Sequence, residues 1–186
     1  TRMRSCALRE ARSDELLAAI GAAGGARWHG SAPILSIVIS TFNRALFVEE
    51  NVRWLTTLTS AHGADVEIVV VDNASDDDTT ERLTPFVTSG AIHYVRNPAN
   101  VGMLGNLRVC TSLIRGHHVW LTGDDDYLFP GALERLLPLL KTFPTVPAVL
   151  QNFGVYYRSE FGAADSAAAF CRELVPMAPH SPVTGF

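Results

Sequence analysis

Val66-Glu67-Ile68-Val69-Val70-Val71 is the stretch that decides the predicted fold. It is apolar at every position except Glu67, and the polar run Asp72-Asn73-Ala74-Ser75 follows it at once. A strand that is apolar on both of its faces is typical of a parallel sheet covered by helices on both sides. The sequence therefore predicts a buried strand here, and its neighbours in the sheet are found by moving outward along the chain.

Similar short apolar runs recur along the chain and alternate with stretches of helical spacing. Further strands are predicted at residues 34–39, 92–95, 118–121 and 148–153, and the strand at 118–121 is expected to be buried. Helices between them are predicted from apolar side chains at helical spacing, namely Val48, Val52, Leu55 and Leu58, then Met103, Leu107, Cys110 and Ile114, and finally Leu133, Leu136, Leu137 and Leu140. This alternation predicts an α/β fold with a mainly parallel sheet flanked by helices.

One more helix is predicted directly after Ser75. Ser75 and Asp78 have the spacing of a capping box, which would place Asp76 and Asp77 in the first helical turn. Pro85 is expected to interrupt this helix early, because proline removes a backbone donor. Pro130 in turn suits the first turn of the last predicted helix.

The bulk properties restrict the possible functions. A chain of 186 residues with 47% hydrophobic residues fits one domain with a substantial core. The net charge of −4 argues against a nucleic-acid-binding surface. No apolar run approaches the roughly 18 residues that a membrane span needs. The cysteines Cys6, Cys110 and Cys171 show neither metal-ligand spacing nor a disulfide framework, which indicates a reducing compartment such as the cytoplasm.

Polar residues gather at the ends of three predicted strands. They form the runs Ser40-Thr41-Phe42-Asn43-Arg44, Asp72-Asn73-Ala74-Ser75 and Gly123-Asp124-Asp125-Asp126. In an open parallel sheet, ligands bind outside the carboxyl ends of the strands, so these runs are expected to meet at one edge. Strands commonly end in polar loops, and each run alone fits a structural role. Their coincidence favours a site.

The three consecutive carboxylates of Asp124, Asp125 and Asp126 follow an apolar strand. Adjacent acids repel one another, and a hard divalent cation that brings phosphates with it would relieve this repulsion. A solvated turn before the next helix is the simpler interpretation. The polar runs at the other strand ends favour the metal interpretation.

Four motifs together resemble family 2 glycosyltransferases, the large inverting group with the Rossmann-like GT-A fold. Ser36–Arg44 resembles the opening strand of the family, and Glu67–Asp77 resembles its second strand and the turn after it. Asn97–Asn106, with Asn100-Val101-Gly102, resembles its helix entry. Gly123–Asp126 followed by Pro130 resembles its metal-binding motif. The family often has an aspartate where Gly123 stands, so the Asp-x-Asp (DXD) form survives here only as Asp124 and Asp126.

The resemblance implies a role for each matching residue. Ser40, Thr41, Asn43, Asn100 and Gly102 would lie along the nucleotide-sugar, and Asp72 would accept hydrogen bonds from the base. Asp124 would face the ribose or the sugar. Asp125 would be the main ligand of the metal, with Asp126 and Asp124 as the further candidate ligands. Which pair of acids holds the ion stays open.

The implied reaction is transfer of a sugar, with inversion, from a nucleotide-diphosphate-sugar to an acceptor hydroxyl. Mg²⁺ or Mn²⁺ would neutralise the departing diphosphate, and a general base would deprotonate the acceptor. In the family, that base follows the metal motif. Here the later acids are Glu134, expected to be solvated on a helix, and the candidates Glu160, Asp165 and Glu173; otherwise the base is expected beyond Phe186.

The resemblance also implies a division of the chain and a set of partners. Residues 1–32 are interpreted as a peripheral N-terminal arm, 33–158 as the nucleotide-sugar-binding core, and 159–186 as the truncated start of an acceptor-side region. Such a fragment would bind the donor but transfer sugar poorly. The expected acceptor is a glycan, a lipid-linked or another hydroxyl compound in polysaccharide biosynthesis, and peripheral association with a membrane surface is left open.

Other interpretations remain beside this one. A metal-dependent phosphohydrolase would use Asp72 as its nucleophile, but it would need a second acid where Ala74 stands. Dinucleotide binding, or a pyrophosphorylase-type nucleotidyltransferase, would need a Gly-rich loop after the first strand, where Ser40–Asn43 has no glycine. A domain that binds nucleotide-sugar or metal without turnover would fit a chain that lacks its base.

Overall fold

The computed structural model describes residues 32–145. The chain divides into two compact units, 1–126 and 127–186, and each is considered by itself. The predicted strand at 148–153 and the predicted arm at 1–32 therefore lie outside the described residues, apart from residue 32 itself. No helix among residues 32–145 is long and apolar enough to cross a membrane.

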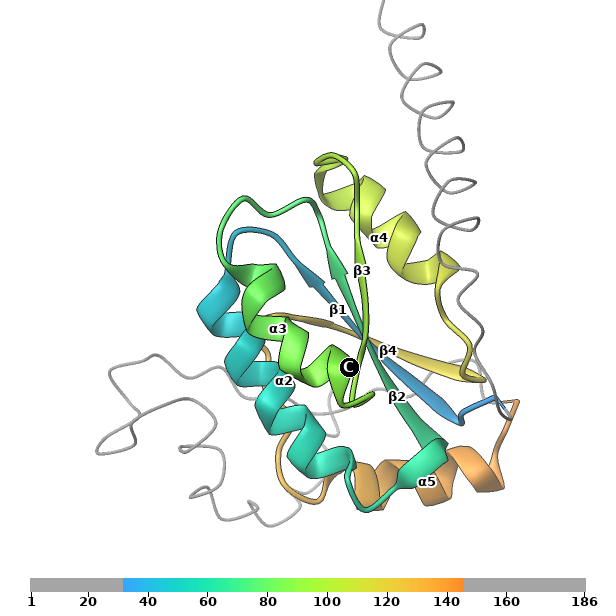
Figure 1. The fold of residues 1–186 in the computed structure, drawn as a ribbon. Coiled ribbons are helices and arrows are strands. Elements are labelled where there is room, and N and C mark those ends of the chain that lie inside the picture. The colour runs from blue at the N-terminus through green and yellow to red at the C-terminus, as the bar shows by residue number, and fades with distance from the viewer. Residues whose placement is uncertain (1–31, 146–186) are drawn as a thin grey trace, which may run out of the picture. The chain divides into compact units, whose positions relative to one another are not determined.

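A four-stranded parallel sheet forms the centre of the first unit. Its strands are β1 (Leu35–Thr41), β2 (Val66–Asp72), β3 (His93–Arg96) and β4 (His118–Gly123), in the order β3-β2-β1-β4. Every pairing is parallel, which confirms the predicted α/β class. β1 is central because it pairs with β2 along one side and with β4 along the other (Figure 1).

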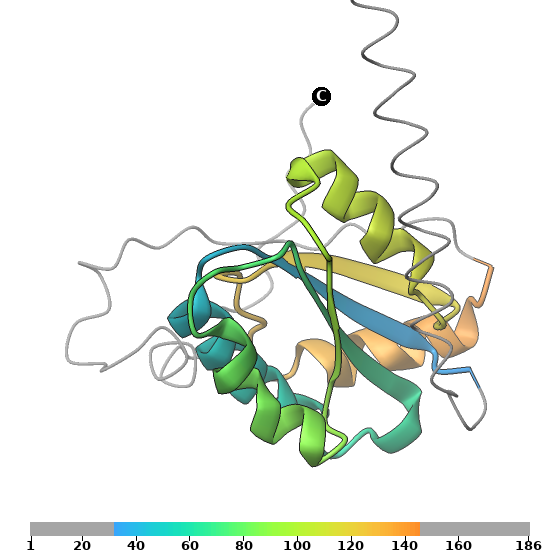
Figure 2. The same ribbon diagram turned by 45° about the horizontal axis from the view of Figure 1, so that its top comes forward.

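Helices cover both faces of this sheet. α2 (Ala45–Thr59) and α3 (Thr79–Thr88) lie on one face and α4 (Gly102–Ser112) lies on the other, as Figures 1 and 2 show. A short 3₁₀ helix, η1 (Gly63–Asp65), leads into β2. Taken by itself, the second unit contains α5 (Ala132–Thr142), in which the four predicted leucines are all buried.

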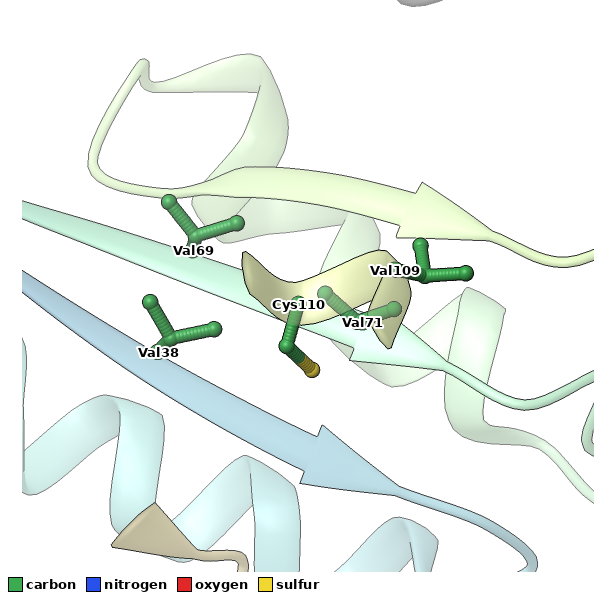
Figure 3. Close-up of a cluster of buried hydrophobic side chains, with 5 residues drawn as sticks. All are labelled: Val38, Val69, Val71, Val109 and Cys110. Atoms are coloured by element: carbon green, nitrogen blue, oxygen red, sulfur yellow. The ribbon is translucent and has the colours of Figure 1, made fainter. Parts of the chain in front are cut away.

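Apolar side chains alternate between the two faces along β1 and β2. On the α4 face, Val38, Val69 and Val71 pack with Val109 and Cys110 of that helix, and all are nearly inaccessible to solvent (Figure 3). On the other face, the predicted helical positions of α2 at 48, 52 and 55 are fully buried. Burial on both faces explains why β2 has an almost continuous apolar sequence.

The predicted start of α3 is wrong. Ser75 lies four residues before the helix and forms no capping box, and the N-cap residue Asp78 makes no side-chain capping bond. The hydroxyl of Ser75 instead donates to the carboxylate of Asp72, which is fully buried. Asp77 Oδ1 accepts a hydrogen bond from the backbone of Thr79 at 3.1 Å. The Ser75 hydroxyl therefore binds the buried carboxylate of Asp72, and not the end of the helix, as the sequence spacing had predicted.

Pro85 does not interrupt α3, contrary to expectation. It lies inside the helix, which runs on to Thr88. Backbone hydrogen bonds persist on either side of the ring, from Arg82 N to Asp78 O at 3.1 Å and from Ser89 N to Pro85 O at 3.1 Å. An interior proline removes its own donor and crowds the carbonyl four residues earlier, but the hydrogen bonds of the flanking turns continue the helix here.

Two burial predictions also need correction. β4 is one of the two edge strands of the sheet that residues 32–145 form, and it is not fully buried, since Val119 and Leu121 are 48% and 43% exposed. Met103, predicted for the apolar face of α4, is 73% exposed, while the polar Asn106 is buried beside Val109.

In the second unit α5 begins at Ala132 rather than Pro130, because the left-handed Gly131 stands at its N-cap.

Two leucines of α2 provide a test of this packing. Leu55 is fully buried and Leu46 is 65% exposed. Leu55→Ala is expected to lower the free energy of unfolding by about 2–5 kcal/mol, because it removes buried methyl groups and leaves a cavity. Leu46→Ala, the matched control, should change it by less than about 0.5 kcal/mol. Urea denaturation measures both; equal effects would contradict the assigned burial.

Candidate functional site

The order of the strands creates a natural binding position at the end of β1. The chain moves outward from β1 to β2 and β3, then crosses back and adds β4 on the other side of β1. The carboxyl ends of β1 and β4 therefore lie side by side, although these strands are far apart in the sequence. A crevice at such a switch point is where ligands bind in open α/β sheets.

A hydrogen bond joins the two strand ends at this position. Thr41 Oγ1, at the end of β1, donates to Asp124 Oδ2 just after β4, at 2.8 Å. Asp124 is only 4% exposed. Burial raises the pKa of Asp124, while the Thr41 hydroxyl and the charge of Arg44 act to lower it.

Arg44 holds two of the three consecutive acids. Its Nε lies 3.2 Å from Asp124 Oδ1 and one terminal nitrogen lies 2.6 Å from Asp125 Oδ2. The guanidinium also lies over the ring of Phe47, 4.6 Å from its centre. Burial alone would lower the pKa of Arg44, but the hydrogen bond to Asp125 and the surrounding aspartates raise it overall. The sequence placed Arg44 in a polar run without giving it this role.

The acidic turn, Gly123–Asp126, is closed by contacts of its own and by one residue of α2. Asp126 Oδ2 accepts from the backbone N–H of Gly123 at 2.9 Å. Asn51 Nδ2 donates to the carbonyl oxygens of Gly123 and Asp126, at 3.1 and 3.0 Å. A Cβ at Gly123 would lie 2.9 Å from Asp126 Oδ2. Glycine at this position, where the resemblance suggests aspartate, thus leaves room for the Asp126 side chain that folds back onto it.

The three predicted metal ligands point to different surroundings. Asp124 is buried against Thr41, Asp126 folds back onto Gly123, and Asp125 leaves 49% of its side chain exposed. Within residues 32–145, no group of three or more His, Cys, Asp or Glu side chains is arranged as a metal centre. Mg²⁺ needs only one or two protein carboxylates when phosphates supply further ligands, so Asp125 fits such an ion as its main protein ligand.

Asp72 is held by the chain itself at the end of β2. The backbone N–H of Ser75 donates to its Oδ1 at 2.9 Å, and Tyr94 Oη donates to its Oδ2 at 2.7 Å. Arg96 lies 3.5 Å from Oδ2. Burial raises the pKa of Tyr94 to about 12, so this phenol stays protonated and donates. The predicted contact of Asp72 with the nucleobase would require Tyr94 or Ser75 to give up its hydrogen bond to Asp72. This contact stays a prediction.

Asn43 connects the loops that follow β1 and β2. Its backbone N–H donates to Ser75 Oγ at 2.8 Å, and its Oδ1 accepts from the backbone of Asp76 at 2.8 Å. Asn43 and Ala74 both have left-handed backbones, with φ of 53° and 64°. Non-glycine residues in this conformation are strained and cluster at functional sites.

A chain of asparagines brings the other predicted residues to the same edge. Asn106 Nδ2 donates to Ser40 Oγ at 2.7 Å, and Asn97 Nδ2 donates to Asn106 Oδ1 at 2.8 Å. Asn73 donates to Asn100 Oδ1 at 2.9 Å, and that same oxygen accepts from the backbone N–H of Gly102 at 2.8 Å. Ser40, Asn100 and Gly102 are therefore fixed to one another through side-chain amides.

The structure thus assembles most of the predicted residues, and adds some that the sequence reasoning missed. Arg44, Asn51 and Tyr94 were missed, and only Arg44 stood in a recognised motif; Asn51 and Tyr94 gave no signal in the sequence. Glu134 is exposed on α5 of the second unit, as expected for a solvated residue. The candidate bases Glu160, Asp165 and Glu173 lie outside the described residues.

Comparison with known families gives a match over most of the chain. The model described as "Glycosyl transferase family 2" matches residues 36–171. This range contains all the strand-end motifs and the acidic turn. The resemblance that the four motifs indicated is therefore confirmed.

Individual proteins resemble the same part of the chain. The abequosyltransferase RfbV of Salmonella typhimurium is 32% identical over 105 residues, which cover 55% of this chain and 31% of RfbV. Staphylococcus aureus TarS 1–349 in complex with UDP-GlcNAc has a TM-score of 0.52 at 19% identity, covering 59% of this chain and 32% of TarS. The mannosyltransferase PcManGT of Pyrobaculum calidifontis, in complex with GDP-Man and Mn²⁺, has a TM-score of 0.50 at 20% identity, covering 79% and 44%.

Thr41→Val tests the hydrogen bond between the strand ends. The hydroxyl stabilises the charged form of Asp124, so its loss is expected to raise the pKa of Asp124 further. The free energy of unfolding should fall by about 1–3 kcal/mol at neutral pH. The loss should shrink as the pH falls through the Asp124 pKa, because the protonated acid needs this donor less.

Carboxyl carbon shifts in NMR titrations and urea denaturation across pH measure these effects. Thr57→Val is the matched control, because the Thr57 hydroxyl donates to a backbone carbonyl on the exposed side of α2. A loss of stability that is the same at all pH values would contradict the assigned bond.

Proposed function

This chain belongs to glycosyl transferase family 2, and on that premise we propose that it transfers a sugar from a nucleotide-diphosphate-sugar to an acceptor hydroxyl with inversion. The observation that carries the proposal is the placement of Asp124 and Asp125 at the β1–β4 switch point, beside Thr41 and Arg44. The chain covers about a third of the length of RfbV, at 31%, so the proposal concerns the donor side above all.

The donor is proposed to lie across the carboxyl ends of β1 and β2. Ser40, Thr41, Asn43, Asn100 and Gly102 line this edge and are held there by the asparagine contacts and by Ser75. Asp72 would accept hydrogen bonds from the nucleobase. Until the donor binds, Tyr94 and Arg96 would hold the Asp72 carboxylate in place. The complexes of TarS with UDP-GlcNAc and of PcManGT with GDP-Man support a nucleotide-sugar as the ligand class.

A divalent cation, Mg²⁺ or Mn²⁺, is proposed to bind at Asp125. When bound, it would neutralise the negative charge that develops on the departing diphosphate. Asn51 fixes the backbone of the acidic turn and so presents Asp125 toward solvent, while Thr41 keeps Asp124 oriented inside. The Mn²⁺ in the PcManGT complex supports a divalent ion as the cofactor.

The acceptor side of the reaction rests on the family alone. Inversion needs a general base opposite the leaving group. Glu160, Asp165 and Glu173 are the candidates within this sequence. The proposed acceptor is a hydroxyl of a glycan or of a lipid-linked compound, reached in the cytoplasm or at the membrane surface.

Asp125→Asn tests the cation site. Calorimetry with Mn²⁺ and either UDP or GDP should show binding that this substitution weakens at least tenfold, or about 1.4 kcal/mol. The amide removes a charged oxygen ligand without changing the size of the side chain. Asp78→Asn, at an exposed carboxylate paired with Arg82, is the matched control and should leave the affinity unchanged. Equal affinity in Asp125→Asn and the parent would place the cation elsewhere.

Asp72 separates this proposal from a phosphohydrolase. A phosphohydrolase of this kind needs a second acid two positions after its nucleophile, and Ala74 stands there. Incubation with p-nitrophenyl phosphate and Mg²⁺ is therefore expected to give no turnover and no phosphorylated Asp72 in mass spectra. Detection of an aspartyl-phosphate at this position would reverse the assignment.

A further inference from the structure

Arg44 and a divalent cation would use the same carboxylates. We infer that the Arg44 guanidinium is a built-in competitor of the cation, which weakens binding of the bare ion and favours the ion that arrives with a nucleoside diphosphate. The inference rests on the proposed function, because it assumes that Asp125 binds the cation. It concerns the order and the selectivity of ligand binding, which the proposed function leaves open.

The competition follows from the geometry of Asp125. A terminal nitrogen of Arg44 is 2.6 Å from Asp125 Oδ2. Mg²⁺ binds carboxylate oxygens at about 2.0–2.1 Å, so this oxygen cannot hold both partners in that direction. An ion on the other oxygen of Asp125 would still lie within a few ångströms of the guanidinium, and like charges repel at that separation.

Two contacts hold Arg44 in this competing position. Its Nε pairs with the buried Asp124 at 3.2 Å, and its guanidinium lies over the Phe47 ring at 4.6 Å. The side chain of Arg44 is nevertheless 40% exposed and that of Asp125 is 49% exposed. Ion pairs with this exposure contribute little free energy, so a ligand can displace the arginine from Asp125.

The charges explain why a nucleotide would help. The acidic turn contains three carboxylates, and Arg44 contributes one positive charge, so a net charge of two minus remains for a divalent cation to neutralise. A bare cation has to separate Arg44 from Asp125 without offering it another partner. A cation bound to a diphosphate brings phosphate oxygens, and guanidinium groups bind phosphate strongly.

Arg44→Gln separates these effects in a binding measurement. Titration of the folded chain with MnCl₂ alone should show an affinity about two- to fivefold higher in Arg44→Gln than in the parent, because the competitor is gone. With UDP or GDP present, this advantage should vanish or reverse, because the parent then gains the arginine–phosphate contact. Arg44→Lys should lie between the two, since an ammonium cannot bridge both acids as the planar guanidinium does.

Two further variants complete the design. Arg53→Gln is the matched control: Arg53 lies on the same helix and pairs with Glu49, away from the acidic turn, so the Mn²⁺ affinity should match that of the parent. Phe47→Leu keeps Arg44 but removes the ring beneath it, and a smaller gain in affinity for bare Mn²⁺ is expected. Phe47 is 44% exposed, so this variant keeps the test available if Arg44→Gln does not fold.

The outcomes for this inference and for the proposed function are distinct. Mn²⁺ binding that depends on Asp125 but is unchanged or weaker in Arg44→Gln would overturn the competition and leave the proposed function standing. Mn²⁺ binding that ignores Asp125→Asn, with and without UDP or GDP, would overturn both. A higher Mn²⁺ affinity in Arg44→Gln that disappears with nucleotide supports the inference.

Discussion

The hydrogen bond from Thr41 to Asp124 is the contact on which the arrangement of the site depends. It joins the carboxyl ends of β1 and β4, which are neighbours in the sheet. Because Asp124 is buried, its charge has to be satisfied inside the protein, and Thr41 and Arg44 are the groups that do so. Arg44, which pairs with the buried Asp124, also reaches Asp125. The position of the exposed Asp125 side chain therefore depends on the contacts of Asp124.

Buried polar groups hold neighbouring segments of the chain together at both ends of the sheet. At the amino end, Ser36 and Glu67 hydrogen-bond each other inside the sheet, and Gly116 packs so closely that a Cβ would lie 2.7 Å from the backbone N of Ser36. That network ties the chain before β4 to β1. At the carboxyl end, asparagines and Asp72 perform the same fastening, but they hold loops whose outer side chains remain exposed. Rigid anchoring below an exposed rim is what preorganised binding requires.

Side chains that bind its backbone hold the acidic turn in shape. Asn51 binds its carbonyl oxygens and Asp126 binds its first N–H, so the turn keeps its shape without using Asp125. Asp125 is therefore an exposed acid that the turn does not need for its shape, and it is open to a ligand. Arg44 limits this accessibility, and a guanidinium can leave a half-exposed carboxylate more easily than a buried one.

Sequence patterns were sufficient for the α/β class and for most of the polar residues that meet at the carboxyl edge of the sheet. The apolar run of β2 required helices on both faces, and the polar runs after β1, β2 and β4 had to meet because parallel strands end at one edge. Motif spacing also identified Asp124–Asp126 and the family, since each motif is local in the chain. Local spacing failed where another contact competed: Ser75 binds buried Asp72 instead of capping α3, and Met103 of the expected apolar face of α4 is exposed while Asn106 is buried.

Tertiary structure alone decided which acid faces solvent and which is buried. Three neighbouring aspartates are equivalent in sequence, and contacts make them different: Thr41 and Arg44, about eighty positions earlier in the chain, bind Asp124 and Asp125, while Asp126 binds the N–H of Gly123. The same holds for β4, whose apolar sequence suggested burial, although its outer position in the described sheet leaves Val119 and Leu121 half exposed. Sequence determined which residues meet at the edge, because strand direction fixes that; the fold determined their burial and charge partners, because those depend on contacts between distant segments.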